Sequence, residues 1–127
     1  MEVRTMAEKE YTPVILVDLA KDRIRIHRVT LNALQNPEYI MLIVNPVEKS
    51  LGIMHGKEGD LGVHKVKIVG KSCYELYSKS LTQKFRQVCT DWVDTGKYRM
   101  VGHIVPGELV ARFNMSEAEF TGTGKVT

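Results

Sequence analysis

Apolar and polar residues alternate with a period of two along residues 23–29, the pattern of a half-buried β-strand. Ile24 and Ile26 fall on one face of this strand, and basic residues fall on the other. Residues 64–69 repeat the alternation, with Val66 and Ile68 on the opposite side from two lysines. Both stretches predict strands with an apolar inner face and a basic outer face.

Two other stretches are apolar almost throughout. Residues 14–19 are rich in β-branched side chains and predict a strand. Residues 39–44 predict a central strand covered on both faces, because both alternating sets of positions are apolar. Turn residues at 45–49 then favour a hairpin whose second strand is residues 50–54.

The clearest helical pattern covers residues 81–92. An apolar stripe recurs there at helical spacing: Leu81, Phe85, Val88, Cys89 and Trp92. Ser80 and Gln83 have the spacing of a capping box, and Gly96 is placed to end the segment. We expect this to be the main helix of the protein.

Shorter elements are predicted by local signals. Thr30 is placed to cap a brief helix over 31–35. Residues 98–105 and 108–113 predict a late hairpin around Pro106-Gly107. Ser116, with an acidic residue three positions on, predicts one further helical turn.

These elements predict an α+β fold, a mainly antiparallel twisted sheet with one main helix (about 81–92) and one or two short helices. The chain has 127 residues, 43% of them hydrophobic and 26% charged, which is typical of one globular domain. We therefore predict a single domain over 1–127, with residues 1–10 and 121–127 flexible because they lack apolar periodicity.

Cys73 and Cys89 are the two cysteines, and neither belongs to a Cys-x-x-Cys pair. The first residues have no apolar signal-peptide core, and no apolar run is long enough to span a bilayer. The prediction is a cytoplasmic protein with free thiols and no membrane partner.

Basic residues give the most functional-looking pattern, although the net charge is only +3, from 18 basic and 15 acidic residues. A sheet face of arginine and lysine neutralises phosphates and binds nucleic acid through counterion release. The predicted nucleic-acid-binding residues are Arg23, Arg25, His27, Arg28, Lys65 and Lys67. The alternative is the ordinary solvated face of an antiparallel sheet, which alternates in the same way.

No motif predicts catalysis, a metal or a cofactor. The glycine-rich segment 56–62 lacks the Gly-Lys-Ser/Thr ending of a phosphate-binding loop and carries two acidic residues. The histidines and cysteines lack the short spacings of zinc sites. Cys89 falls on the apolar stripe of the main helix, where a small core residue is expected.

Part of the chain resembles the swapped-hairpin DNA-binding domain of AbrB-type transition-state regulators. The resemblance is carried by residues 25–34, 39–44 and 51–53, a strand, a short helix and a hairpin in that order. It implies dimerisation and a basic DNA-facing surface around Arg23, Arg25 and Arg28.

The chain also resembles small uncharacterised proteins of phages and mobile elements of Gram-positive bacteria. The matching pattern comprises Thr30-Leu31, Ala33-Leu34, Pro37-Glu38-Tyr39-Ile40, Asn45-Pro46 and Leu51-Gly52-Ile53. This resemblance implies an accessory role, including inhibition of a host defence system, and brings no activity with it.

Three functions remain open on the sequence alone. The first is a non-enzymatic, homodimeric nucleic-acid-binding or regulatory protein that acts through the basic sheet face. The second is a protein-binding inhibitor or accessory factor of phage or mobile-element origin, which docks a protein target through an edge strand or a helix face. The third is an enzyme whose catalytic residues are dispersed along the chain.

Overall fold

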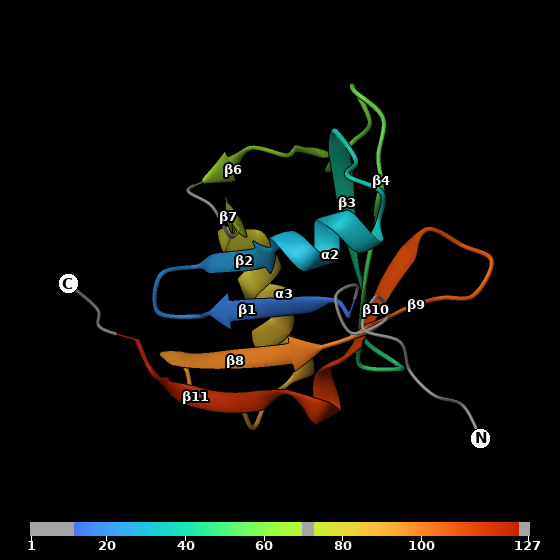
Figure 1. Ribbon diagram of the computed structural model, residues 1–127. Coiled ribbons are helices and arrows are strands. Elements are labelled where there is room, and N and C mark those ends of the chain that lie inside the picture. The colour runs from blue at the N-terminus through green and yellow to red at the C-terminus, as the bar shows by residue number, and fades with distance from the viewer. Residues whose placement is uncertain (1–11, 70–72, 125–127) are drawn as a thin grey trace, which may run out of the picture.

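Two antiparallel sheets form the framework of the protein in a computed structural model that describes residues 12–69 and 73–124 (Figure 1). The six-stranded sheet contains, in spatial order, β11 (Glu119–Thr123), β8 (Gly96–Val101), β1 (Val14–Asp18), β2 (Arg23–His27), β7 (Cys73–Tyr77) and β6 (Ile68–Val69). The predicted α+β class with mostly antiparallel strands is therefore correct.

The five-stranded sheet is a second layer that the sequence did not separate from the first. Its spatial order is β5 (His64–Lys65), β3 (Tyr39–Asn45), β4 (Ser50–His55), β10 (Val110–Asn114) and β9 (His103–Ile104). The predicted hairpin of 39–44 with 50–54 is confirmed as β3–β4, and the late hairpin is confirmed as β9–β10.

Gly102 is where the chain changes sheets. The strand predicted over 98–105 is in fact split into β8 in one sheet and β9 in the other. A Cβ atom at Gly102 would lie 2.4 Å from the Arg112 carbonyl oxygen and 2.7 Å from the Phe113 ring, so only glycine fits without displacement. The Gly102 N–H donates to the Pro13 carbonyl, 2.9 Å away, which ties the crossing point to the start of β1.

The strand predicted over 64–69 is divided in the same way. β5 pairs with β3 in the five-stranded sheet, whereas β6 pairs with β7 in the six-stranded sheet. The apolar positions of the pattern, Val66 and Ile68, lie between the two pieces and in β6, so the alternation by itself does not reveal a change of partner. Lys65 and Lys67 therefore do not share a strand.

The main helix, α3, spans Lys79–Val88, two residues earlier at its start and four earlier at its end than predicted. Its cap is Ser78, whose hydroxyl accepts from the Leu81 N–H at 3.2 Å, and Ser80 is inside the first turn. Cys89 is the C-cap, and Gly96 begins β8 instead of ending the helix.

Helix α2 (Arg28–Ala33) begins before the predicted cap. Thr30 lies within it, fully buried, and its hydroxyl donates to the Val14 carbonyl at 2.7 Å and accepts from the Val14 N–H at 2.8 Å. The side chain thus pairs with the start of β1 instead of with the helix terminus.

Two strands were not expected. Cys73–Tyr77 form β7, which pairs with β2 along its whole length. After the 3-10 helix η1 (Met115–Glu117), which Asn114 caps, the chain forms β11, and residues 121–123 of the segment predicted to be flexible belong to this strand. The predicted flexible residues 1–10 and 125–127 lie outside the described part of the chain.

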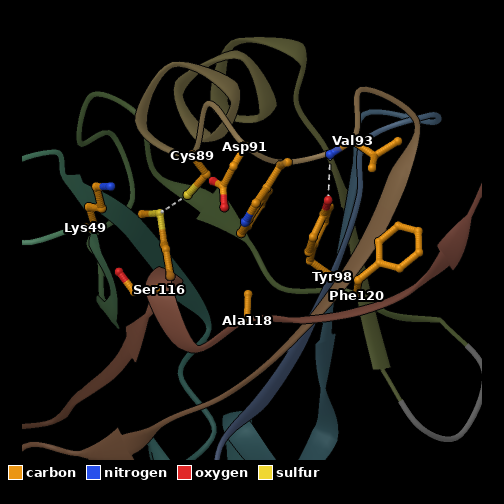
Figure 2. A pocket seen from close by; sticks show the side chains of 10 residues that line it. Lys49, Cys89, Asp91, Val93, Tyr98, Ser116, Ala118 and Phe120 are labelled. Atoms are coloured by element: carbon orange, nitrogen blue, oxygen red, sulfur yellow. Dashed lines mark hydrogen bonds between the residues drawn. The ribbon is translucent and has the colours of Figure 1, made fainter.

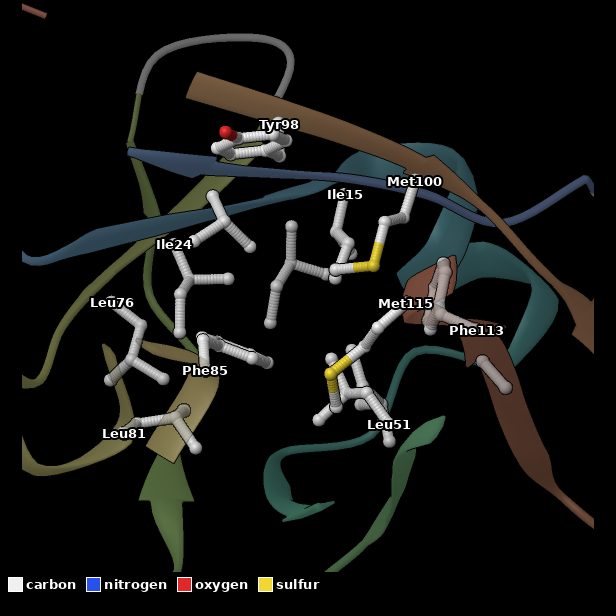
Figure 3. Close-up of a cluster of buried hydrophobic side chains, with 14 of the residues drawn as sticks. Ile15, Ile24, Leu51, Leu76, Leu81, Phe85, Tyr98, Met100, Phe113 and Met115 are labelled. Atoms are coloured by element: carbon white, nitrogen blue, oxygen red, sulfur yellow. The ribbon is translucent and has the colours of Figure 1, made fainter. Parts of the chain in front are cut away.

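Side chains from both sheets and α3 meet in one core (Figure 3). Ile24 and Leu76 come from the six-stranded sheet, Leu51 and Phe113 from the five-stranded sheet, and Phe85 from α3. Each sheet therefore has one face in the core and one face turned outward.

We expect Gly102→Ala to lower the free energy of unfolding by about 3 kcal/mol, because the new methyl group overlaps backbone and a buried ring. Urea unfolding would measure the loss. Gly59→Ala is the matched control, since its Cβ meets open space and only its positive φ of 90° costs about 1 kcal/mol. Equal losses in the two variants would show that Gly102 is not a steric constraint.

Candidate binding surfaces

The outward face of the six-stranded sheet carries the basic residues of β2 (Figure 1, where α3 lies behind the sheet). Strand register places five side chains in one row across five strands: Glu119, Arg99, Leu16, Arg25 and Glu75. Each arginine in this row thus has an acidic neighbour on its outer side and Leu16 on its inner side.

Arg23 belongs to the next row and is not available to a ligand. It is only 8% exposed, and its guanidinium donates to the Asp18 carboxylate at 3.1 Å. Glu75 lies 3.9 Å away on its other side. Asp18 and Arg23 are opposite each other in the β1–β2 hairpin, so the register itself creates the ion pair.

Arg25 is the more accessible arginine of β2, with 38% of its side chain exposed. Its Nε donates to Glu75 at 3.2 Å, and the same carboxylate accepts from the Tyr77 hydroxyl at 3.1 Å. Glu75 therefore offsets much of the positive charge that the sequence of β2 suggested.

A small basic cluster remains around Leu16. Arg25 and Arg99 lie two strands apart, about 10 Å, on either side of this residue. His27 lies two residues beyond Arg25 on the same face of β2. Burial is the largest cause that lowers its pKa, the positive charges of Arg99 and Arg25 lower it further, and a backbone hydrogen bond at Val14 opposes the shift. Arg99 is not among the predicted residues, although the alternation of Tyr98, Arg99 and Met100 in the sequence is enough to place Arg99 on an outer face.

The other three predicted residues lie elsewhere. Arg28 is exposed at the first residue of α2. Lys65 is on β5, in the other sheet, and Lys67 is exposed between β5 and β6. The structure thus brings together Arg23, Arg25 and His27, and does not assemble all six residues into one surface.

Charge on this outward face is nearly balanced. Of the described residues on its strands, four are cations, Arg23, Arg25, Lys97 and Arg99, and three are anions, Asp18, Glu75 and Glu119, which leaves one net positive charge. The face is therefore mainly a network of cross-strand ion pairs.

The outward face of the five-stranded sheet is apolar at its centre. Met41, Met54 and Val110 are cross-strand neighbours in one row, all half-buried, and Ile43 in the next row is 47% exposed. We call these four residues the docking face. Gly52, opposite Ile43, adds no side chain, so Met54 and Val110 lie beside an open position on β4.

Covering of β3 on both faces was predicted, and within the described residues this is wrong. Ile40 of β3 is buried in the core on the inner face, whereas Ile43 is exposed on the outer face. The described residues thus leave part of the apolar outer side of β3 exposed.

A polar hollow of about 340 Å³ adjoins the docking face. Its lining residues are Glu48, Ser50, Val101, His103, Arg112, Asn114 and Glu117. Arg112 pairs with Glu48 at 2.5 Å and is the cross-strand neighbour of His103. An apolar centre with a charged, paired border is the usual composition of a protein–protein interface.

Chemistry at the cysteines is limited by burial. Cys89 is 4% exposed and its thiol lies 3.7 Å from the Met115 sulfur. Burial, with the negative charge of Asp91, raises the pKa of this thiol, which disfavours the nucleophilic thiolate. In the described ranges no three His, Cys, Asp or Glu side chains gather in a group able to hold a metal ion.

Comparison with known proteins returned no match to any family model, curated protein or solved structure. Among the described residues, no helix combines the length and apolar character needed to cross a membrane.

The lowered pKa of His27 predicts a pH dependence of stability. The unfolded chain takes up a proton at His27 more readily than the folded chain does. The contribution of His27 to the free energy of unfolding is therefore complete above the ordinary histidine pKa of about 6.5 and is lost as pH falls below that value. We expect the free energy of unfolding to decline between about pH 7 and pH 5.5, and His27→Gln to reduce this slope.

Urea unfolding across that pH range measures both slopes. Burial lowers the pKa of His64 as well, so His64→Gln should remove a further part of the decline. An unchanged slope in His27→Gln would contradict the assignment.

Proposed function

We propose that this protein is a non-enzymatic accessory factor that binds another protein through the docking face. The observation that carries the proposal is the apolar outer surface of β3, β4 and β10, where Met41, Met54 and Val110 line up beside the exposed Ile43. An antiparallel sheet that keeps one face in water normally carries polar side chains there.

The composition of the docking face favours a protein over a small ligand. Two methionines at its centre supply flexible, polarisable side chains that adapt to a partner's shape. The adjoining Arg112–Glu48 pair carries no net charge, so it does not attract a polyanion. The partner that fits is a protein presenting a comparable apolar surface, and a second copy of this chain satisfies the same chemistry.

The phage or mobile-element origin and the role against a host defence system are part of this proposal and rest on the sequence resemblance. A cytoplasmic location is proposed because Cys73 and Cys89 are both free thiols, as a reducing compartment would keep them.

Ile43→Glu should abolish capture of the partner, with at least a tenfold loss of affinity, because a carboxylate would be buried against an apolar surface. The measurement is a nuclease-treated pull-down from the host cell, with light scattering on the purified chain to detect a second copy. Folding should be unaffected, since the side chain is already 47% exposed.

Ile68→Glu is the matched control. It makes the same substitution at an isoleucine that is 41% exposed, on β6 of the other sheet. One stoichiometric protein retained by wild type and by Ile68→Glu, and lost by Ile43→Glu, supports the proposal. Equal capture by all three chains, or capture that nuclease removes, contradicts it.

Nucleic-acid binding is the second candidate, and the basic cluster of Arg25, His27 and Arg99 favours it. Strand register places these three side chains on the same outward face of the sheet, and the two arginines lower the pKa of His27. Two phosphates would have to compete with Glu75 and Glu119 for the guanidinium groups, so affinity is expected only at low salt.

If this candidate is correct, the double variant Arg25→Ala/Arg99→Ala should lower the salt dependence of log K by about two phosphate contacts. Fluorescence anisotropy with single- and double-stranded DNA and with RNA would measure it. Lys65→Ala/Lys67→Ala removes the same charge at two other predicted residues, which lie outside the basic cluster, and should change the slope less. Equal effects of the two double variants would show that only net charge matters.

A further inference from the structure

A hollow of about 420 Å³ lies beside the core, apart from both outward sheet faces (Figure 2). The loop that follows α3 forms one wall, η1 and the start of β11 form the other, and Lys49 reaches its edge from the β3–β4 turn. Its volume falls within the range of small-molecule sites.

Aromatic rings form a fixed wall of this pocket. Trp92 stacks on Tyr98 with ring centroids 4.1 Å apart and planes 8° from parallel, and Phe120 meets the edge of Tyr98 at 5.5 Å. The Tyr98 hydroxyl accepts from the Val93 N–H at 2.6 Å, which holds the ring and the loop together. Phe120 remains 52% exposed, so apolar ring surface stays accessible to a ligand.

Opposite charges lie at the edge of the pocket. Lys49 and Asp91 are both exposed, and neither forms an ion pair with another residue in the described part of the chain. Both line the hollow together with the buried Cys89. An ammonium donor and a carboxylate acceptor therefore approach the same hollow from its border, together with the Ser116 hydroxyl.

Lys49 occupies its place at a conformational cost. Its φ is 52°, in the left-handed region where glycine or asparagine is usual, at the end of a turn that the Asn45 side chain organises. The Met115 N–H donates to the Lys49 carbonyl at 2.8 Å and so fixes this residue to η1. The strained turn and the Met115 hydrogen bond together hold Lys49 at the edge of the hollow.

We propose that this pocket binds a nucleobase-bearing small molecule, a nucleoside or its 5′-monophosphate. A planar base suits ring walls, and its edge presents donors and acceptors in one plane. Asp91 accepts from a ring or exocyclic N–H of the base, and Lys49 pairs with the phosphate. A purely apolar ligand would leave both charged side chains without a partner.

Trp92 provides the measurement, because it is the single tryptophan of the chain and lines the pocket. Nucleosides and their 5′-monophosphates, titrated with excitation at the red edge of tryptophan absorption, should quench its fluorescence with dissociation constants of about 1 mM or tighter.

Two exposed substitutions separate binding from folding. Asp91→Ala should weaken nucleoside and monophosphate alike by at least about fivefold, the loss of one charge-assisted hydrogen bond. Lys49→Asn should weaken only the monophosphate, while the free energy of unfolding stays equal or rises, because asparagine tolerates the left-handed backbone. Glu108→Ala removes a carboxylate away from the pocket and should change neither affinity.

Three outcomes would overturn the proposal. The first is no quenching at about 5 mM of any nucleoside or monophosphate, and the second is equal affinity of Asp91→Ala and wild type. The third is equally tight binding of N-acetylphenylalaninamide, which would mean that binding depends only on the aromatic surface of the ligand. These variants leave Ile43 and the docking face intact, so the pull-down result and the fluorescence result stand or fall separately.

Discussion

The passage of the backbone at Gly102 is the constraint on which both sheets depend. At this residue the chain leaves β8 and enters β9, so close to Arg112 and Phe113 that no side chain can be present. The close approach lets Phe113 and Met100 belong to one core although they come from different sheets. Without this close approach, neither sheet would have enough apolar area to form a core with α3 by itself.

Single strands and the main helix could be predicted from the sequence because their signals are local. The isoleucines of β2 and the stripe of Leu81 and Phe85 are buried as their periodicity required. The number of sheets could not be predicted, since alternation in 98–105 is the same whether the strand stays with one partner or changes at Gly102. The cap of α3 was placed two residues late because Ser78 and Ser80 are chemically equivalent candidates.

The surroundings of the basic residues could not be predicted for a related reason. Alternation correctly placed Arg23 and Arg25 on the outward face, but it gave no information about what lies opposite them. The hairpin puts Asp18 against Arg23, and β7, a strand not anticipated, puts Glu75 against Arg25. The net charge of a sheet face depends on the side chains of adjacent strands, and the pattern within one strand carries no information about them. Met41 and Ile43 show the same limit for apolar residues. The apolar sequence of β3 predicts cover on both faces, but Ile43 on its outer face is exposed.

The pairing of β1 with β8 has a consequence for synthesis on the ribosome. β1 begins at Val14 and its partner ends at Val101, so most of the chain must be made before that edge is closed. Until then β1 and β2 form a hairpin with an apolar face and an open edge, a species prone to pair with other chains. Thr30, which emerges soon after the hairpin, bonds both backbone groups of Val14 on the β2 side of the strand. It therefore lengthens the contact between β1 and the chain after β2, while the edge that β8 later occupies stays open.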